Sequence, residues 1–413
     1  MAIAANGVAI VGGRLAHRLA ATVGSSALVW YGVPLAWRNL LDDRRRLLRS
    51  TMGIAFAVLL MLVELGFRDA FLESALQIIR GFDADIVLVS ATKFRFGRKD
   101  PFSRRHLYVA RGSPGVASAA PVYGEWTKSL WKNPQTHKPY TVQVLAFDPD
   151  QPVFLFPDIT ARLSELRQPD TVVVDRRGRR FLGTAQEGTQ TELAARAIRV
   201  VGTFPLGPDF TDDGTLVMSD RNFFTLFSPR TLGNHELPNI EIGIVKVLPG
   251  YPVRQVQATL QQTLGKTVSV LTKNEMIDRE ISFQSTVSPV GPIFAFGTAI
   301  GFAVGILIVY QILYNDLSDQ LPQYATLKAM GFTNGYLVRT VLAQSVLYAL
   351  IGFLPAWLIG TALFRSLSEL SLLPLSMTPG ITLISATLTL GMCLFSGWLA
   401  LRRVLAADPA EIF

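Results

Sequence analysis

The sequence predicts a membrane protein with four transmembrane helices and one α+β domain outside the cytoplasm. Three observations predict this fold class. Only 17% of the 413 residues are charged, whereas soluble domains carry about a quarter, and the mean hydropathy is +0.33. Four apolar stretches are long enough to cross a bilayer core of about 30 Å, which needs roughly 20 helical residues. Between the first two stretches, the residues alternate between strand and helix patterns.

The four spans are expected at residues 50–71, 291–314, 338–364 and 377–401. The second and the fourth contain no Asp, Glu, Lys or Arg. Arg339 lies at the start of the third span, where a long side chain can extend to the interface. The later spans are joined by residues 315–337 and by the short loop 365–376.

Basic residues border these spans. They are Arg44, Arg45, Arg46 and Arg49 before the first span, and Arg402 and Arg403 after the fourth. Cytoplasmic flanks of membrane spans carry an excess of Lys and Arg. We therefore expect both termini, including the tail 402–413, on the cytoplasmic side of the membrane. Residues 72–290 and 365–376 then lie outside the cytoplasm. The net charge of +8 also fits nucleic acid, but its placement favours membrane lipid headgroups, and we expect no nucleic acid partner.

Residues 1–33 form an N-terminal extension rich in Ala, Gly and Val. This composition resembles a signal peptide. However, Arg14, His17 and Arg18 interrupt the apolar stretch, and no basic region precedes it. We expect a poorly ordered or interfacial extension, and a cleaved or spanning segment is the alternative.

The domain outside the cytoplasm, residues 72–290, is expected to combine strands with helices. Apolar or β-branched runs indicate strands at residues 85–90, 141–148, 171–175, 240–247 and 268–271. The run 240–247 alternates apolar and polar side chains, as a half-buried strand does. A β-rich lobe is expected as an insertion at about residues 170–238, where the segments are shorter and richer in Gly, Asp and Pro.

Helices are expected between these strands. Residues 102–111 look helical, Pro252 can open a second helix, and Gly265 can close it. Thr272 and Glu275 have the spacing of a capping box, in which each side chain satisfies a free backbone N–H at a helix start. Strand–helix–strand pieces at both ends of the domain predict the two halves of a split βαβ fold.

No residues with catalytic or metal-binding spacing are evident. The four histidines, His17, His106, His137 and His235, lack metal-ligand spacing. The single cysteine, Cys393, excludes an intramolecular disulfide. Gly265, Lys266 and Thr267 resemble the end of a phosphate-binding loop, but that pattern needs glycine at position 260, which is Leu. We expect no enzymatic activity, no metal and no cofactor bound by this chain.

Two charged groups have alternative interpretations. Glu64 and Arg68 stand four residues apart, and Glu64 lies about 20 Å along the helix from Ser50, near the outer interface. An ionisable group in a span is a functional candidate, but we expect a local ion pair. The second group consists of Arg176, Arg177, Arg179 and Arg180 around Gly178. It is either a solvated turn or a contact for anionic headgroups or an acidic partner.

The most informative segment is residues 315–337, between the second and third spans. Ser318 or Asp319 can cap a helix, and Gly331 can adopt the left-handed conformation that ends one. The segment is unusually apolar for a loop, with Leu327, Met330 and Phe332. We interpret it as a helix that docks a partner protein at the membrane surface. A helix that rests on lipid is the alternative.

At this segment the chain resembles permeases of the MacB/FtsX-type ABC superfamily, whose cytoplasmic loop carries an "LKAxG" helix that contacts the ATPase. The matching residues are Tyr324, Ala325, Thr326, Leu327, Lys328, Ala329, Met330, Gly331 and Phe332. The resemblance is closer still to the DevC-type permease of cyanobacteria, associated with heterocyst glycolipid export. The resemblance covers roughly residues 34–413. The stretches that are similar are residues 34–41, 65–72, 84–90, 102–109, 130–135, 310–315, 324–338 and 407–413. Pro322 departs from the pattern, because a better helix former is expected there.

This resemblance implies the permease subunit of a tripartite ABC exporter for an envelope lipid or glycolipid. Two copies of the permease would pair with a separate ATPase subunit, which binds ATP and Mg. The periplasmic domain would dock a membrane-fusion adaptor that leads to a TolC-like outer-membrane protein. The spans would then transmit ATPase motion to the periplasmic domain instead of forming a channel. Residues 34–49 would form an amphipathic cytoplasmic helix, with Trp37 and Leu40 toward lipid.

Other functions remain open at this point. An FtsX-like subunit passes ATPase motion to a cell-wall hydrolase without transporting anything, and a lipoprotein-releasing permease handles a different cargo. A membrane enzyme would need a site that we do not find in the sequence.

Overall fold

The chain folds into two compact units. The helical unit comprises residues 1–65, 295–362 and 377–413, and the sheet unit comprises residues 66–294 and 363–376. The computed structural model describes residues 44–227, 239–322, 326, 330 and 333–406. The predicted extension 1–33, residues 34–43 of the predicted interfacial helix and the end of the tail lie outside the described residues.

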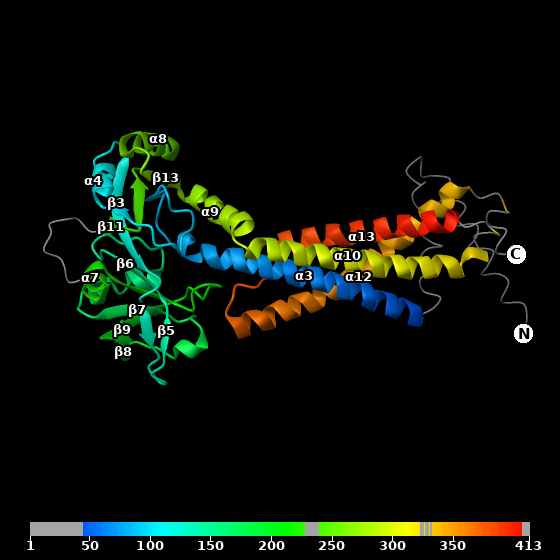
Figure 1. Cartoon of the computed structure of the whole chain (residues 1–413), viewed down its shortest axis with the longest axis horizontal. Coiled ribbons are helices and arrows are strands. Elements are labelled where there is room, and N and C mark those ends of the chain that lie inside the picture. The colour runs from blue at the N-terminus through cyan, green and yellow to red at the C-terminus, as the bar shows by residue number, and fades with distance from the viewer. Residues whose placement is uncertain (1–43, 228–238, 323–325, 327–329, 331–332, 407–413) are drawn as a thin grey trace, which may run out of the picture. The chain divides into compact units, whose positions relative to one another are not determined.

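Over the described residues, four helices are long and apolar enough to cross a membrane. They are α3 (Arg44–Arg80), α10 (Val290–Asp319), α12 (Asn334–Ser371) and α13 (Pro379–Ala406). Each predicted span falls on one of these helices, which run alongside one another in Figure 1. The predicted interfacial helix 34–49 is not separate over its described part. Residues from Arg44 onward belong to α3, because nothing between Arg44 and the first span breaks a helix.

Close packing of α10 on α3 depends on glycines four residues apart. A Cβ added to Gly301 would stand 3.1 Å from Met61 Cγ, and one added to Gly305 would stand 3.3 Å from Ala57 Cβ. At Gly297 the added atom would stand 2.5 Å from Glu64 Cδ. Small residues at this spacing let two helix backbones approach closely. Gly297 and Gly301 therefore face α3, whereas Gly305 lies between α3 and α13, where an added Cβ would stand only 2.5 Å from Met392 Sδ.

The sheet unit is built on one mixed sheet. Its described strands follow the order β13-β1-β12-β3-β6-β10-β7-β9-β8-β4-β5. Their bounds are β1 (Ile86–Ser90), β3 (Val116–Glu125), β4 (Leu130–Lys132), β5 (Pro139–Thr141), β6 (Gln143–Phe147), β7 (Thr171–Asp175), β8 (Gln190–Leu193), β9 (Arg196–Phe204), β10 (Thr215–Ser219), β12 (Ile242–Val247) and β13 (Val268–Thr272). All pairs are antiparallel except β6 with β10 and β7 with β9.

The predicted split βαβ fold is present at one end of this sheet. Helix α4 (Arg105–Arg111) connects β1 toward β3, and α8 (Val253–Leu264) connects β12 to β13. In space, β12 lies between β1 and β3, and β1 lies between β12 and β13. Each strand–helix–strand piece is therefore split by a strand of the other piece.

The inserted lobe is longer than predicted and continues the same sheet. It begins after Glu125, where β3 ends, and not at about residue 170, because β4, β5 and β6 also lie between β3 and β12 in the sequence. Strand β6 pairs directly with β3, Val122 opposite Phe147. The β-branched run at 141–148 identifies this strand, but it carries no information about its pairing partner.

Both faces of the sheet are covered by helices. Ile86 and Leu88 pack on one face with α4 and α8, and Val87 and Val89 pack on the other face with α9 (Lys273–Ser282) and the end of α3. The further helices of the unit are α5 (Pro157–Thr160), α6 (Leu163–Leu166), α7 (Asp220–Phe227) and the short helical turns η2 (Arg180–Leu182) and η3 (Phe283–Val287). The prediction of a half-buried strand at 240–247 was wrong for residues 242–245, which are buried. The reason is that β12 is a central strand between two helical layers.

Local signals placed both ends of α8 and the start of α9 correctly. Helix α8 begins after Pro252 and ends at Gly265, whose φ of +74° favours glycine. The capping box of Thr272 and Glu275 opens α9. The predicted helix 102–111 starts later than expected. Its first two residues form β2 (Phe102–Ser103), which pairs with β11 (Asn239–Ile240).

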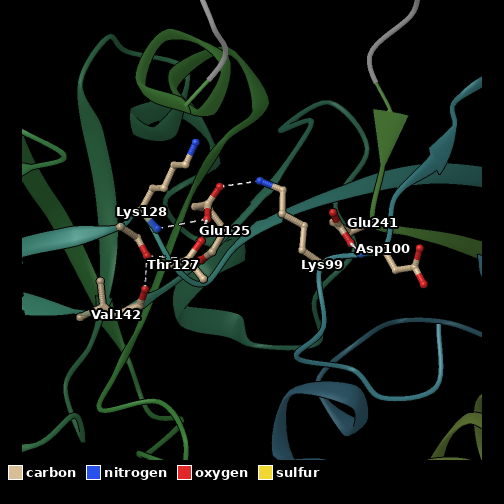
Figure 2. A network of polar contacts seen from close by, with 8 residues as sticks. Lys99, Asp100, Glu125, Thr127, Lys128, Val142 and Glu241 are labelled. Carbon is tan, nitrogen blue, oxygen red and sulfur yellow. Dashed lines mark hydrogen bonds and ion pairs between the residues drawn. The ribbon is translucent and has the colours of Figure 1, made fainter.

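Two buried carboxylates fasten the segment after β1 to the sheet, as Figure 2 shows. Glu125 accepts a hydrogen bond from Lys99 Nζ at 2.7 Å and from the backbone N–H groups of Thr127 and Lys128. Glu241 accepts from Lys93 Nζ and from the Asp100 N–H, each at 3.1 Å. Burial raises the pKa of Glu125, but its hydrogen bonds outweigh burial and lower the pKa to about 2.

We predict that Glu125→Gln lowers the unfolding free energy of the sheet unit by roughly 2 kcal/mol at pH 7, because a neutral amide cannot form an ion pair with Lys99. The pKa of Glu125 lies near 2 in the folded state, below its ordinary value of 4.5. The stability it contributes is therefore present above pH 4.5 and lost as the pH falls toward 2. Denaturation of the full-length protein in detergent, followed by tryptophan fluorescence, measures both effects.

Glu192→Gln provides the matched control. Glu192 pairs with Lys132 on the surface, with 47% of its side chain exposed, so its loss should cost about 0.5 kcal/mol or less. If the two variants lost the same unfolding free energy, the buried ion pair of Glu125 would not have the role assigned to it. The same holds if the difference in unfolding free energy between wild type and Glu125→Gln stays constant down to pH 2.

Candidate coupling site

Asp316, in the last turns of α10, joins three helices through one buried carboxylate. Its side chain is 4% exposed and forms an ion pair with Arg46 of α3. It also accepts hydrogen bonds from the Tyr348 hydroxyl and, at 3.3 Å, from Gln344 Nε2, both on α12. Arg46 pairs in addition with Asp319 at 3.2 Å. We call Arg46, Asp316, Asp319, Gln344 and Tyr348 the Asp316 cluster.

The charges of this cluster oppose the dipoles of their own helices. Helix α3 begins with arginines and no acid, and α10 ends with acids and no base. A helix N-terminus favours acidic side chains, and a C-terminus favours basic ones. Leaving a buried carboxylate unpaired is also costly. The Arg46–Asp316 pair offsets both effects, and therefore holds the start of α3 to the end of α10.

An apolar contact next to Asp316 brings in the fourth helix. Leu317 of α10, Val341 of α12 and Leu401 of α13 are buried together. Through Asp316 and the neighbouring Leu317, the end of α10 therefore contacts α3, α12 and α13. A displacement of the end of α10 would act on all of these helices.

The segment predicted to contact a partner follows the cluster directly in the sequence. Of its nine predicted residues, Thr326 and Met330 are described, and the others lie outside the described residues. The Met330 N–H donates to the Thr326 carbonyl at 3.0 Å, four residues back, as in an α-helical turn. Thr326 Oγ1 donates to the Pro322 carbonyl at 2.9 Å. Met330 is 64% exposed, so its apolar side chain is free to meet another surface.

The arginines predicted to contact headgroups differ in their surroundings. Arg45 and Arg49 are exposed, and the guanidinium of Arg402 lies 5.7 Å from the ring centroid of Trp398. Arg46 instead turns inward to Asp316 and is 28% exposed. A buried acid on α10 therefore competes with lipid headgroups for Arg46, and the headgroup role of these arginines stays a prediction. The side chains of Arg44 and Arg403 lie outside the described residues.

The predicted ion pair of Glu64 with Arg68 does not appear among the ion pairs of the described residues. The Glu64 carboxyl group lies over Gly297 of α10. The glycine provides the space, since a side chain there would collide with this carboxyl group. Spacing along one helix indicated Arg68 as the partner, but packing against α10 directs Glu64 elsewhere.

The remaining candidate motifs have structural explanations. Gly265, Lys266 and Thr267 follow helix α8 and precede strand β13, the reverse of the strand-to-helix order of a phosphate-binding loop. The arginine run forms a turn after β7, in which Arg176 pairs with Asp158 and Arg179 with Asp213. Over the described residues, no group of three or more His, Cys, Asp or Glu could hold a metal ion.

Sequence reasoning missed Gln344, Tyr348 and the role of Asp316. A signal was present, because Gln344 and Tyr348 stand four apart on one face of an apolar helix, and Asp316 interrupts the end of another. Polar groups at such positions require partners inside the protein. The glycine spacing of α10, at Gly297, Gly301 and Gly305, was likewise readable as a packing face.

Over the described residues, the fold is that of a membrane protein with four apolar helices and a large α+β unit inserted between the first two of them. Residues 292–409 match the family model described as FtsX-like permease C-terminal. Two sequences of Mycobacterium tuberculosis, from the CDC 1551/Oshkosh and H37Rv strains, are each named an uncharacterized ABC transporter permease. Each is 25% identical to this chain over 383 residues, 92% of this chain and 98% of the relative. The chain is a homologue of ABC transporter permeases and carries an FtsX-like permease domain.

Two solved structures are also similar. One is the periplasmic region of MacB from Actinobacillus actinomycetemcomitans, with 13% identity, a TM-score of 0.33, and coverage of 51% of this chain and 96% of that chain. The other is the extracellular domain of the noncanonic ABC-type transporter YknZ from Gram-positive bacteria, with 12% identity, a TM-score of 0.30, and coverage of 45% and 99%.

We predict that Asp316→Asn lowers the stability of the helical unit by roughly 2–3 kcal/mol, because it leaves the Arg46 charge without its buried partner. Thermal loss of helicity of the full-length protein in detergent measures this. Asp319→Asn is the matched control. It removes the other acid that pairs with Arg46, but its side chain is 68% exposed, so the loss should stay below about 1 kcal/mol. If Asp316→Asn and Asp319→Asn lost the same amount of stability, burial of Asp316 would not determine the strength of its ion pair with Arg46.

Proposed function

We propose that this chain is the permease subunit of a tripartite ABC exporter, and that it transmits motion from a separate ATPase to its sheet unit. The observation that carries the proposal is the Asp316 cluster, which joins α10 to α3 and α12. The cluster is followed in the sequence by the helical turn between Thr326 and Met330, called the Met330 turn, in which Met330 is exposed. Residues 315–337 dock the ATPase, which holds ATP and Mg. The chain itself does not hydrolyse ATP.

The docking step rests on the chemistry of the Met330 turn. An exposed methionine on a short helical turn suits a hydrophobic groove on a partner, because its side chain is flexible and polarizable. The turn lies between α10 and α12 in the sequence, and both helices contribute to the Asp316 cluster. Movement of the docked partner would therefore displace the end of α10 first. The ion pair to Arg46 would pass this displacement to α3.

The transmission step rests on chain continuity. Helix α3 runs without interruption from Arg44 in the helical unit to Arg80 in the sheet unit. Helix α10 follows α9 and η3 of the sheet unit with a break of only two residues. The spans at 291–314 and 377–401 contain no charged residue, which favours transmission over a polar pathway through the membrane.

The remaining components follow from the resemblance to MacB- and DevC-type permeases. We propose that the chain acts as a homodimer in the bacterial inner membrane, with both termini in the cytoplasm and the sheet unit in the periplasm. There the sheet unit docks a membrane-fusion adaptor that leads to a TolC-like duct, and the cargo is an envelope lipid or glycolipid. Deletion of the gene should then remove one lipid class from the outer envelope. Unchanged envelope lipids with altered cell-wall cleavage would favour the FtsX-like signalling function instead.

We predict that Met330→Asp, alone or together with Leu327→Asp, abolishes stimulation of the ATPase and weakens its co-purification at least tenfold. A charge at this position cannot enter an apolar groove. The assay is ATP hydrolysis by the partner with and without the permease in lipid nanodiscs. The conservative variant Met330→Leu keeps the volume and apolar character, and should retain stimulation.

The outcome can be separated from misfolding. Met330 is exposed, so its replacement should leave the thermal midpoint of the permease within a few degrees of wild type. Full ATPase stimulation by Met330→Asp and Leu327→Asp together would show that the docking assignment is wrong.

A further inference from the structure

The segment that connects β1 to β2 is unusually basic and aromatic. Its residues 93–99, called the basic strap, read Lys-Phe-Arg-Phe-Gly-Arg-Lys, so four of the seven carry a cation and two carry an aromatic ring. The strap belongs to the sheet unit and takes no part in the Asp316 cluster or the Met330 turn. Basic residues interleaved with apolar rings are typical of segments that lie on an anionic membrane surface. A solvated loop is the alternative.

Every third residue of the strap is bound to the sheet unit. Lys93 Nζ, the Phe96 N–H and Lys99 Nζ each donate to a carboxylate, at 3.1, 2.8 and 2.7 Å. The three acceptors are, in that order, Glu241, Glu280 and Glu125, the last of which is shown with Lys99 in Figure 2. All three acids are buried. They therefore hold the strap in place without adding negative charge to its outer surface.

The residues between these anchors face outward. Phe94 is 40% exposed, and the guanidinium carbon of Arg98 lies 4.4 Å from the centroid of its ring, within the range of a cation–π contact. Arg98 is exposed and forms none of the ion pairs of the described residues. Lys99 keeps 52% of its side chain exposed, whereas Arg95 lies near acids that offset its charge. The outer surface of the strap thus presents one apolar ring and two cations.

The strap lies beside the start of a span. The ring of Phe94 is 5.3 Å from that of Phe283, which opens η3, and α10 begins seven residues later at Val290. Seven residues of helix rise about 10 Å, and the headgroup region extends about 5–8 Å beyond the apolar core. Long basic side chains can cover the remaining distance. Between the two, Val287 is apolar and 68% exposed. The outer surface of the strap is therefore within reach of lipid headgroups.

We propose that the basic strap binds a bilayer surface that contains anionic phospholipid. The Phe94 ring lies at the level of the headgroups, and Arg98 and Lys99 contact their phosphates. Each basic side chain next to an anionic surface strengthens binding by about fivefold, and the acids beneath the strap are buried, so anionic lipid is preferred to zwitterionic lipid. The contact requires that α10 crosses the membrane, and it does not depend on the coupling function proposed above.

Fluorescence quenching in nanodiscs tests the proposal. Thr92, which is exposed and directly precedes the strap, is changed to cysteine and labelled with a fluorophore, since the native Cys393 is buried. The full-length protein is placed in phosphatidylcholine nanodiscs. These contain, at equal mole fraction, phosphatidylglycerol or phosphatidylcholine with a nitroxide at the same upper acyl position. The phosphatidylglycerol quencher should quench the label at least twofold more, and high salt should reduce this preference because it screens the cations.

Variants connect the preference to the strap. Arg98→Glu together with Phe94→Ser should abolish the preference for phosphatidylglycerol, whereas Arg98→Lys keeps the charge and should retain it. The matched control is Arg180→Glu together with Phe181→Ser. This pair is also an exposed arginine beside an exposed ring, but it lies in η2, in the inserted lobe. The control should quench like wild type.

Misfolding is separable from loss of the contact. Phe94 and Arg98 are exposed, and the three anchors of the strap remain, so thermal midpoints should stay within a few degrees of wild type. The proposal is overturned if neither lipid quenches the label, or if the two lipids quench it equally. It is also overturned if the preference survives Arg98→Glu with Phe94→Ser, or if the control pair removes it to the same extent.

Discussion

The ion pair between Arg46 and Asp316 is the contact on which the rest of the helical unit depends. It joins residues 270 positions apart in the sequence and brings the start of the first span to the end of the second. The pair is favourable only because Tyr348 and Gln344 complete the hydrogen bonding of the carboxylate. Without them, a buried acid at a helix C-terminus would be opposed by both desolvation and the helix dipole. The cluster therefore specifies how α3, α10 and α12 assemble.

The sheet unit is held together by different means. Its central strands are buried on both faces, and carboxylates such as Glu125 and Glu241 fasten the neighbouring loop through charged hydrogen bonds. These contacts make the unit cohesive in its own right. Helix α3 enters it as a continuous rod that ends at Arg80. This continuity of α3 from one unit into the other is what the transmission step of the proposed function relies on.

Much of the fold was predictable, because the signals for it are local. The apolar spans, the Pro252 and Gly265 boundaries of α8, and the Thr272–Glu275 capping box depend on residues close together in the sequence. What the sequence did not reveal depends on partners far apart. The pairing of β6 with β3, and hence the extent of the insertion, is one case. The ion pair of Arg46 with Asp316 is another case. The run of arginines around Arg46 has the same composition as a cluster that faces lipid headgroups, so the sequence does not single out Arg46. Glu64 shows the same limitation, because its carboxyl group lies over Gly297 of α10, far away in the sequence, and makes no recorded ion pair with Arg68.

A double-mutant cycle on Arg46→Gln and Asp316→Asn tests the central claim most directly. The quantity to measure is the stimulation of the partner ATPase by the permease in nanodiscs, for wild type, both single variants and the double variant. If the two residues act through one another, each single change should reduce stimulation, and the double variant should be no worse than the weaker single variant. Losses that multiply in the double variant, or stimulation that survives either change, would contradict the account.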